Sequence, residues 1–201
     1  MNHILQPEAR IGQRLGGCLV YLIGPSGAGK DSLLRAAAEP LAALGARIAT
    51  RMITRPSGSV GEEQAIGLAP QEFQARRERG DFALHWQANQ LHYGIPREID
   101  DWLAADRIVV VNGSRGHLGE ARRRYPGLLP VLLHVEEAVL RERLRRRGRE
   151  SAEQIEARLR RSRRMQAELA SEAGLHVLDN SGSLQDCVER LLTLIRQHAD
   201  R

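Results

Sequence analysis

The sequence predicts an α/β fold in which a parallel sheet is covered by helices on both faces. Short, continuous apolar runs recur as "CLVYLIG" (18–24), "RIVVVNG" (107–113) and "LLPVLLHV" (128–135), which is typical of strands buried on both faces. Segments with helical spacing of leucine and alanine separate these runs, and strands that alternate with helices in this way form parallel sheets. We find no internal repeat and no low-complexity linker.

The remaining elements are predicted from apolar periodicity and from turn residues. Helices are expected over 31–45, 70–80, 98–105, 117–126, most of 137–173 with a break near 145–151, and 183–199. Two further strands are expected over 46–50 and 175–180, a loop over 55–63, and a mixed stretch over 82–96 that ends in a turn. Pro40 should bend or end the first helix, and Gly45 should terminate the helical segment after Pro40.

Composition indicates one globular domain. The chain has 201 residues, of which 42% are hydrophobic and 27% charged, which is sufficient for a single packed core. Cys18 and Cys187 have neither metal-ligand spacing nor a disulfide framework, so a reducing compartment is expected. No apolar run approaches the roughly 18 residues that span a bilayer, and the first residues lack the pattern of a signal peptide. These features favour the cytoplasm and no membrane partner.

Arginine carries almost all of the positive charge. The net charge is +5, and Lys30 is the only lysine among 30 basic residues. The guanidinium fork matches phosphate oxygens in pairs, so this composition suits either nucleic acid or a small substrate with several phosphates. Aromatic residues make up only 3% of the chain and do not alternate with the arginine runs, which disfavours nucleic acid as a partner.

A glycine-rich loop follows the first predicted strand. The segment "GPSGAGKDSLL" (24–34) has the glycine and lysine spacing of a phosphate-binding loop, in which backbone N–H groups surround a phosphate and the lysine reaches the outer phosphates of a nucleotide. The alternative is a glycine-rich turn without a ligand. The expected nucleotide-binding residues are Gly24, Pro25, Ser26, Gly27, Ala28, Gly29, Lys30, Asp31 and Ser32, and Lys30 is also expected to be catalytic.

The loop departs from the usual pattern directly after its lysine. Asp31 stands where a serine or threonine hydroxyl usually reaches Mg²⁺, and Ser32 follows one residue later. A carboxylate is a suitable oxygen ligand for Mg²⁺, although without the metal it would repel a triphosphate. The alternative is that Asp31 stabilises the first turn of a helix, while Ser32 or water binds the metal. Asp31 and Ser32 are therefore the candidate metal ligands.

Five segments together resemble one family of kinases. They are "GPSGAGKDSLL", "TRMITRPSGSVGEE", "FALHWQANQLHYG", "VVVNGSRG" and "LRERLRRRGRESAEQIEARLRRS", in the order and spacing of the guanylate kinase-like branch of nucleoside monophosphate kinases. The resemblance covers about 18–197 and implies a P-loop NTPase fold with a small acceptor-binding insert at about 50–98 and a helical lid at about 141–160. Residues 1–17 are then an N-terminal extension. The resemblance also implies ATP as phosphoryl donor and Mg²⁺.

The acceptor-binding motifs differ from those of guanylate kinases. Gly58 stands where guanylate kinases have the second arginine of the motif that binds the acceptor phosphate. His85 and Trp86 stand where those kinases have the Glu-Trp pair of the stretch that recognises the base, and Asn112 and Ser114 replace two aspartates. A guanine base would lose hydrogen-bond acceptors there, at about 1 to 3 kcal/mol for each unpaired group. Within the branch, the chain more closely resembles relatives whose acceptor is ribose 1,5-bisphosphate and which carry the same Gly-Lys-Asp-Ser sequence.

The expected acceptor is accordingly a phosphorylated sugar. Its expected binding residues supply cations and hydrogen-bonding groups, and they are Arg51, Arg55, Glu62, Tyr93, Asn112, Ser114 and Arg115, with Asn89 as a further candidate. For Asn112 and Ser114 the alternative is capping of the helix that begins near Gly116, and for Tyr93 it is packing.

The arginine-rich segment 140–162 is most simply a solvated helical face, and several of its arginines must have that role. The resemblance implies in addition that Arg147 and Arg158 act on the phosphoryl group in transit, with Arg143 and Arg149 as weaker candidates. It also places Asn180 near the adenine of the donor. An acceptor phosphate is already ionised at neutral pH, so positioning and charge neutralisation suffice and no catalytic base is needed.

The resemblance implies ATP-dependent phosphorylation of ribose 1,5-bisphosphate to 5-phospho-α-D-ribose 1-diphosphate, as in phosphonate breakdown, and we expect a monomer or homodimer. Two alternatives remain: a guanylate kinase with an altered pocket, and a catalytically inactive binding module of the same fold. An intact loop lysine and lid arginines argue against the inactive module, which would not need them.

Overall fold

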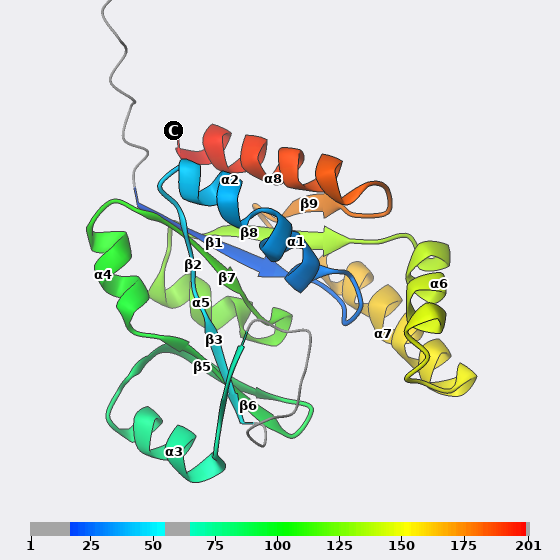
Figure 1. Cartoon of the computed structure of the whole chain (residues 1–201), viewed down its shortest axis with the longest axis horizontal. Helices are drawn as coiled ribbons and strands as arrows, with labels where there is room; N and C mark the ends of the chain where they lie inside the picture. The colour runs from blue at the N-terminus through cyan, green and yellow to red at the C-terminus, as the bar shows by residue number, and fades with distance from the viewer. Residues whose placement is uncertain (1–16, 55–64, 200–201) are drawn as a thin grey trace, which may run out of the picture.

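The structure, a computed structural model, describes residues 17–54 and 65–199 (Figure 1). The loop predicted over 55–63 lies outside the described residues, and so do Arg55 and Glu62. No helix among the described residues is long and apolar enough to cross a membrane.

A five-stranded parallel sheet forms the centre of the fold, as predicted. Its order is β2-β7-β1-β8-β9, with β2 at Arg47–Ile48, β7 at Ile108–Asn112, β1 at Cys18–Ile23, β8 at Leu129–His134 and β9 at His176–Asp179. The alternate residues of β1 pack into different clusters: Val20 and Leu22 into one, Tyr21 and Ile23 into the other. This arrangement explains why the strand is a continuous apolar run.

Helices cover both faces of this sheet (Figure 1). On one face, α1 (Lys30–Ala36), α2 (Ala38–Ala43) and α8 (Leu184–Ala199) pack on the cluster that contains Val20. On the other face, α4 (Glu98–Ala104) and α5 (Leu118–Arg124) pack on the cluster that contains Tyr21, and the short 3₁₀ helix η1 (Arg115–His117) directly precedes α5. Helix α6 (Glu137–Arg147) lies beyond the end of β8, and α7 (Ala152–Leu169) runs back from it, so that Met165 and Leu169 pack in the cluster that contains Tyr21.

A second, smaller sheet holds most of the predicted acceptor region. Its order is β4-β3-β6-β5, with β4 at Ala65–Leu68, β3 at Arg51–Thr54, β6 at Leu91–Pro96 and β5 at Phe82–Ala88. β5 and β6 form a hairpin whose two turn residues, Asn89 and Gln90, both have positive φ, the geometry that matches the twist of paired strands. The mixed stretch predicted over 82–96 is therefore a β-hairpin.

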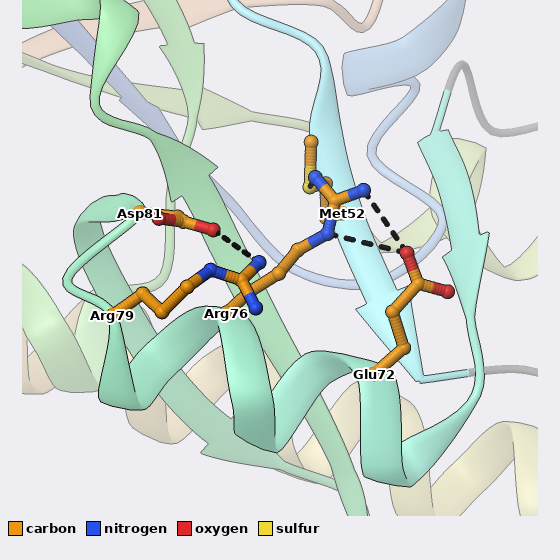
Figure 2. Close-up of polar contacts among 5 residues, drawn as sticks. All are labelled: Met52, Glu72, Arg76, Arg79 and Asp81. Atoms are coloured by element: carbon orange, nitrogen blue, oxygen red, sulfur yellow. Dashed lines mark hydrogen bonds and ion pairs between the residues drawn. The ribbon is translucent and has the colours of Figure 1, made fainter.

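Helix α3 (Pro70–Glu78) covers part of the second sheet and is joined to it by polar contacts (Figure 2). The Arg76 guanidinium donates to the Glu72 carboxylate one turn earlier, with Nη2 to Oε1 at 3.0 Å, and also contacts the Met52 sulfur of β3 at 3.7 Å. Arg79 pairs with Asp81 at 2.7 Å beyond the end of the helix. Through the contact of Arg76 with Met52, the helix is joined to β3.

Two predicted elements differ in detail from the structure. The strand expected over 46–50 is confirmed only at Arg47–Ile48, because the chain then leaves the main sheet and enters β3 of the second one. The break near Pro40 occurs three residues earlier than expected, at Ala37 between α1 and α2. Pro40 lies in the first turn of α2, where its missing N–H leaves no intrahelical hydrogen bond unmade. Gly45, with φ of 73°, terminates α2 as predicted.

Candidate active site

The phosphate-binding loop joins the buried strand β1 to helix α1. Gly27 and Gly29 have φ of 93° and 90°, values that other residues rarely adopt, so the loop needs glycine at both positions. The Lys30 ammonium lies across the loop, with Nζ 2.8 Å from the Gly24 carbonyl oxygen and 3.2 Å from that of Pro25. The only lysine of the chain is thus held beside the curled backbone, where a phosphate group would meet it.

A cleft of about 1060 Å³ extends from this loop to the second sheet and to the α6–α7 segment. The structure brings most of the predicted site residues together in its lining. These are Gly24, Pro25, Ser26, Gly27, Gly29, Lys30, Asp31, Ser32, Arg51, Tyr93, Asn112, Ser114, Arg115, Arg147, Arg158 and Asn180, with the further candidates Asn89, Arg143 and Arg149. Ala28 belongs to the loop but is fully buried in the main core. A shallower hollow of about 460 Å³ on α8 contains none of these residues.

Asp31 and Asn112 meet at the floor of the cleft. The Asn112 side-chain amide donates to Asp31 Oδ1 at 2.9 Å, although the two residues are 81 positions apart in sequence. Asn112 is only 5% exposed, and its Oδ1 atom is buried without a hydrogen-bond partner among the described residues. The Asp31 carboxylate and the neighbouring Ser32 hydroxyl both line the cleft and are hard oxygen donors of the kind that Mg²⁺ prefers, so these two residues fit a magnesium ion bound together with nucleotide phosphates.

A buried arginine lies in the part of the cleft that the second sheet lines. Arg51 is 8% exposed, its guanidinium carbon lies 5.1 Å from the centre of the Tyr93 ring, and its Nη1 donates to the Asn112 carbonyl oxygen at 3.4 Å. Trp86 stacks almost parallel to Tyr93, with ring centres 5.6 Å apart, because β5 and β6 place the two residues directly opposite each other. The Arg51 guanidinium is thus held over the Tyr93 ring as a largely buried positive charge beside the cleft, where an anionic group can pair with it.

The segment after β7 is clamped by a buried tyrosine. The Tyr21 hydroxyl accepts from the Ser114 backbone N–H at 3.0 Å and donates to the Ser114 carbonyl at 3.1 Å. Burial raises the pKa of Tyr21 to about 12, so its phenol keeps its proton. Among the described residues, the Ser114 side chain makes no capping hydrogen bond to η1, and the Asn112 amide bonds Asp31 instead, so the capping alternative is wrong for both.

Arg115 also lines the cleft but is paired with α7. Its Nη1 lies 2.5 Å from the Glu168 carboxylate, and both side chains are partly exposed. An exposed pair of this kind contributes only about 0 to 1 kcal/mol, so a phosphate could replace the carboxylate as the partner of Arg115.

The arginines of α6 and α7 reach the phosphate-binding loop. Arg158 Nη1 donates to the Ser26 hydroxyl at 2.6 Å and pairs through Nη2 with Glu150 at 2.8 Å. Arg143 donates to the Asn180 carbonyl oxygen at 2.8 Å, and the Asn180 amide in turn donates to the Ala28 carbonyl beneath the loop at 2.8 Å. The break between the two helices falls at Gly148, as expected. The proposed contact of Asn180 with adenine stays a prediction.

Several residues of the cleft were not predicted as site residues. Arg35 follows the loop by little more than one turn of α1, and Arg161 lies one turn after Arg158 on the same face of α7, a spacing that could have identified it. Trp86 was recognised only as a replacement within a motif. Its stacking depends on hairpin register, which the sequence does not indicate.

The fold and the cleft define a class of protein. A parallel sheet, a glycine loop with its lysine after the first strand, hard oxygen donors at the loop, and arginines on several elements around one cleft are the parts of a P-loop kinase.

Comparisons with known proteins agree with this class and specify it. The family model described as "AAA domain" matches residues 20–170. A solved guanylate kinase from Anaplasma phagocytophilum superposes with a TM-score of 0.66 at 16% identity, covering 94% of this chain and 89% of its own, and a gluconokinase from Sinorhizobium meliloti with a TM-score of 0.53 at 24% identity, covering 94% and 96%. At these identities, the two structures support the fold alone.

Closer relatives share half or more of the sequence. The "Ribose 1,5-bisphosphate phosphokinase PhnN" of Pseudomonas fluorescens is 59% identical over 180 residues, covering 89% of this chain and 94% of the relative. The protein of the same name from Azotobacter vinelandii is 54% identical over 185 residues, covering 92% and 99%. The chain belongs to the ribose 1,5-bisphosphate phosphokinase family, which confirms and narrows the resemblance to guanylate kinase-like enzymes.

Proposed function

We propose that this chain transfers the γ-phosphoryl group of ATP to the 1-phosphate of ribose 1,5-bisphosphate and so produces 5-phospho-α-D-ribose 1-diphosphate, the reaction that the phosphonate breakdown route uses. The observation that carries the proposal is the single cleft in which the loop lysine Lys30 and the buried cation Arg51 are both present. Such a cleft suits a nucleotide triphosphate at one end and a sugar phosphate at the other.

The donor would bind through the loop. Its backbone and Lys30 would hold the outer phosphates, and Asp31 and Ser32 would hold Mg²⁺, which neutralises phosphate charge when bound. Asn180 lies against Gly29, at the side of the loop where we expect the adenosine.

The acceptor would bind in the same cleft, on the side that the second sheet lines. Arg51 and Arg115, together with Arg55, would pair with its phosphates, while Tyr93 and Ser114 would offer hydrogen bonds to the sugar. Glu62 and Asn89 are further candidates for hydroxyl contacts. Asn112 is nearly buried and donates to Asp31, so its part in binding the sugar is indirect.

The chemistry then needs no proton acceptor, because the attacking phosphate oxygen carries a negative charge at neutral pH. The protein has to hold two anions in line and to offset their repulsion. Lys30, Arg147 and Arg158 are the cations that we assign to the phosphoryl group in transit. Arg158 already contacts the loop at Ser26, which supports this assignment.

Guanylate kinase activity is the main competing function. The positions that read guanine lack their carboxylates here, and the place of the Glu-Trp pair is taken by His85 and by Trp86, whose ring is stacked on Tyr93. A guanine edge would leave its N–H donors unpaired in this environment.

A coupled assay of ADP release tests the function against both alternatives. Purified protein with ATP and Mg²⁺ is given ribose 1,5-bisphosphate, GMP or no acceptor. We expect turnover with the sugar bisphosphate only. Turnover with GMP alone would support a guanylate kinase, and silence with both acceptors would support a binding module. We place the reaction in the cytoplasm, where ATP is abundant, and expect a monomer or homodimer without nucleic-acid partners.

A further inference from the structure

The hydrogen bond between Asn112 and Asp31 joins the two places at which P-loop enzymes hold their metal. In such enzymes a serine or threonine hydroxyl after the loop lysine and an aspartate at the end of a nearby strand share Mg²⁺. Asp31 directly follows Lys30, and Asn112 is the last residue of β7, which pairs with β1. In this chain the carboxylate is on the loop and the neutral side chain is on the strand.

We propose that the two positions have exchanged their chemistry, so that Asp31 supplies the carboxylate for Mg²⁺ and Asn112 is the residue that positions it. This inference rests on the proposed kinase function and deepens it. It explains together two departures from the common pattern that otherwise look unrelated, the aspartate in the loop and the missing aspartate on the strand.

The surroundings of Asn112 support a positioning role. Its amide N–H is directed at Asp31 Oδ1 at 2.9 Å, and its own Oδ1 is buried without a hydrogen-bond partner among the described residues. An asparagine suits this place, because its amide N–H donates to the carboxylate without bringing a charge of its own. An aspartate at 112 would instead bring a second negative charge to the same place, and each carboxylate would oppose ionisation of the other.

The same residue touches the acceptor side. Arg51 donates to the main-chain carbonyl of Asn112 at 3.4 Å, while the Asn112 side chain donates to Asp31. The donor and acceptor halves of the cleft therefore share this strand end. A change of the Asn112 side chain should disturb the metal side first, because only the main chain of Asn112 contacts Arg51 in these two bonds.

If the two positions have exchanged their chemistry, loss of the Asp31 carboxylate should change nucleotide affinity in opposite directions with and without Mg²⁺. Without metal, the negative Asp31 carboxylate repels the negative phosphates of the nucleotide. With metal, the carboxylate and the phosphates both bind Mg²⁺, and this attraction outweighs the repulsion between them. Removing the carboxylate should thus weaken nucleotide binding in Mg²⁺ and strengthen it in a chelating buffer. A purely structural role of Asp31 would weaken binding in both.

The test measures affinity for a non-hydrolysable ATP analogue by titration calorimetry, in Mg²⁺ and in EDTA, with no acceptor present. The variants are Asp31→Ser, Asn112→Asp and the double variant, which restores the common arrangement. We expect Asp31→Ser to bind about 10-fold more weakly in Mg²⁺ and several-fold more tightly in EDTA. The double variant should regain the wild-type ratio between the two buffers to within about 5-fold.

Two controls make the result decisive. Glu39→Ser removes one carboxylate from the exposed surface of α2, outside the cleft lining, and should leave both affinities unchanged. Thermal unfolding identifies variants that do not fold, and if the double variant is among them, the sign of the Asp31→Ser effect decides alone. Equal weakening in both buffers, or a folded double variant without metal dependence, would overturn the exchange.

The acceptor is left out so that the two proposals can fail separately. Wild-type protein that binds the analogue in a metal-dependent way but releases no ADP with ribose 1,5-bisphosphate would contradict the proposed substrate. It would leave the exchange of Asp31 and Asn112 in place.

Discussion

Arg158 of α7 donates a hydrogen bond of 2.6 Å to the hydroxyl of Ser26 in the phosphate-binding loop, across 132 positions of sequence. The second contact of this guanidinium is Glu150, whose side chain is 12% exposed and whose Oε2 atom has no hydrogen-bond partner among the described residues. The segment predicted as a lid is therefore already connected to the loop at a residue that we assign to catalysis.

Arg158→Ala should reduce kcat by about 100-fold, because it removes a cation from the phosphoryl group in transit. The KM for the acceptor should change little. Steady-state kinetics of ADP release measure both. Arg160→Ala is the matched control, since Arg160 is exposed on the same helix and outside the cleft lining, and it should behave as wild type. A similar loss in both variants would mean that α7 tolerates no arginine substitution, and would count against a catalytic Arg158.

Lys30→Ala should reduce kcat by about 100- to 1000-fold while the protein stays folded. The side chain contacts loop carbonyl oxygens and is partly exposed, so its loss removes charge without opening a cavity in the core. Lys30→Arg should recover little activity, because a planar fork does not fit the place of a compact ammonium group. Activity of Lys30→Ala within about 3-fold of wild type would refute the catalytic assignment.

Arg51→Ala should raise the KM for ribose 1,5-bisphosphate by about 10-fold or more, because it removes the cation that we assign to an acceptor phosphate. The control is Arg47→Ala, because Arg47 also stacks on an aromatic ring, with 5.3 Å to the centre of Trp102, but lies outside the cleft. Loss of the stacking alone should affect the two variants alike, so only a selective effect of Arg51→Ala on the acceptor KM supports our assignment.

Gly113→Ala should lower the free energy of unfolding by about 1 to 3 kcal/mol. A Cβ atom at Gly113 would lie 2.3 Å from Tyr21 Cζ, and the buried Tyr21 ring cannot move without releasing its bonds to Ser114. At Gly119 in α5, an added Cβ would meet no described atom within 4 Å apart from its chain neighbours and the backbone of its own helix, so Gly119→Ala should be neutral or slightly stabilising. Urea unfolding of the two variants checks the difference, and equal stabilities would show that Tyr21 does not fix this turn.

Alkaline pH should destabilise the fold through three buried acids. Burial raises the pKa of the Cys18 and Cys187 thiols from 9.0 to about 11, and that of the Tyr21 phenol from 10.0 to about 12. Because the unfolded chain ionises first, these groups have their full effect on stability below about pH 9 and lose it between about pH 9 and 12. Urea unfolding over this range measures the slope, which Cys187→Ala should reduce. An unchanged slope in that variant would contradict the shifted thiol.

Much of the main sheet can be predicted from local information. A strand that is buried on both faces must be apolar at successive positions, and β1, β7 and β8 all show this pattern. The loop after β1 is equally local, because its glycines and Lys30 act through the backbone within a few residues. The start of α7 was also present in the sequence, since Ser151 and Gln154 have the spacing of a capping box, which the structure contains. We did not recognise it.

The sequence by itself therefore determined the sheet, the loop and the class of anionic ligand, since apolar period, glycine freedom and arginine content are properties of single segments. Only the tertiary structure decided which polar and aromatic side chains contact one another. The hydrogen bond from Asn112 to Asp31 is not indicated by the sequence, and the stacking of Trp86 on Tyr93 depends on the register of the β5–β6 hairpin. Hydrogen bonds act over about 3 Å, so their partners become known only when the chain brings distant segments to that separation.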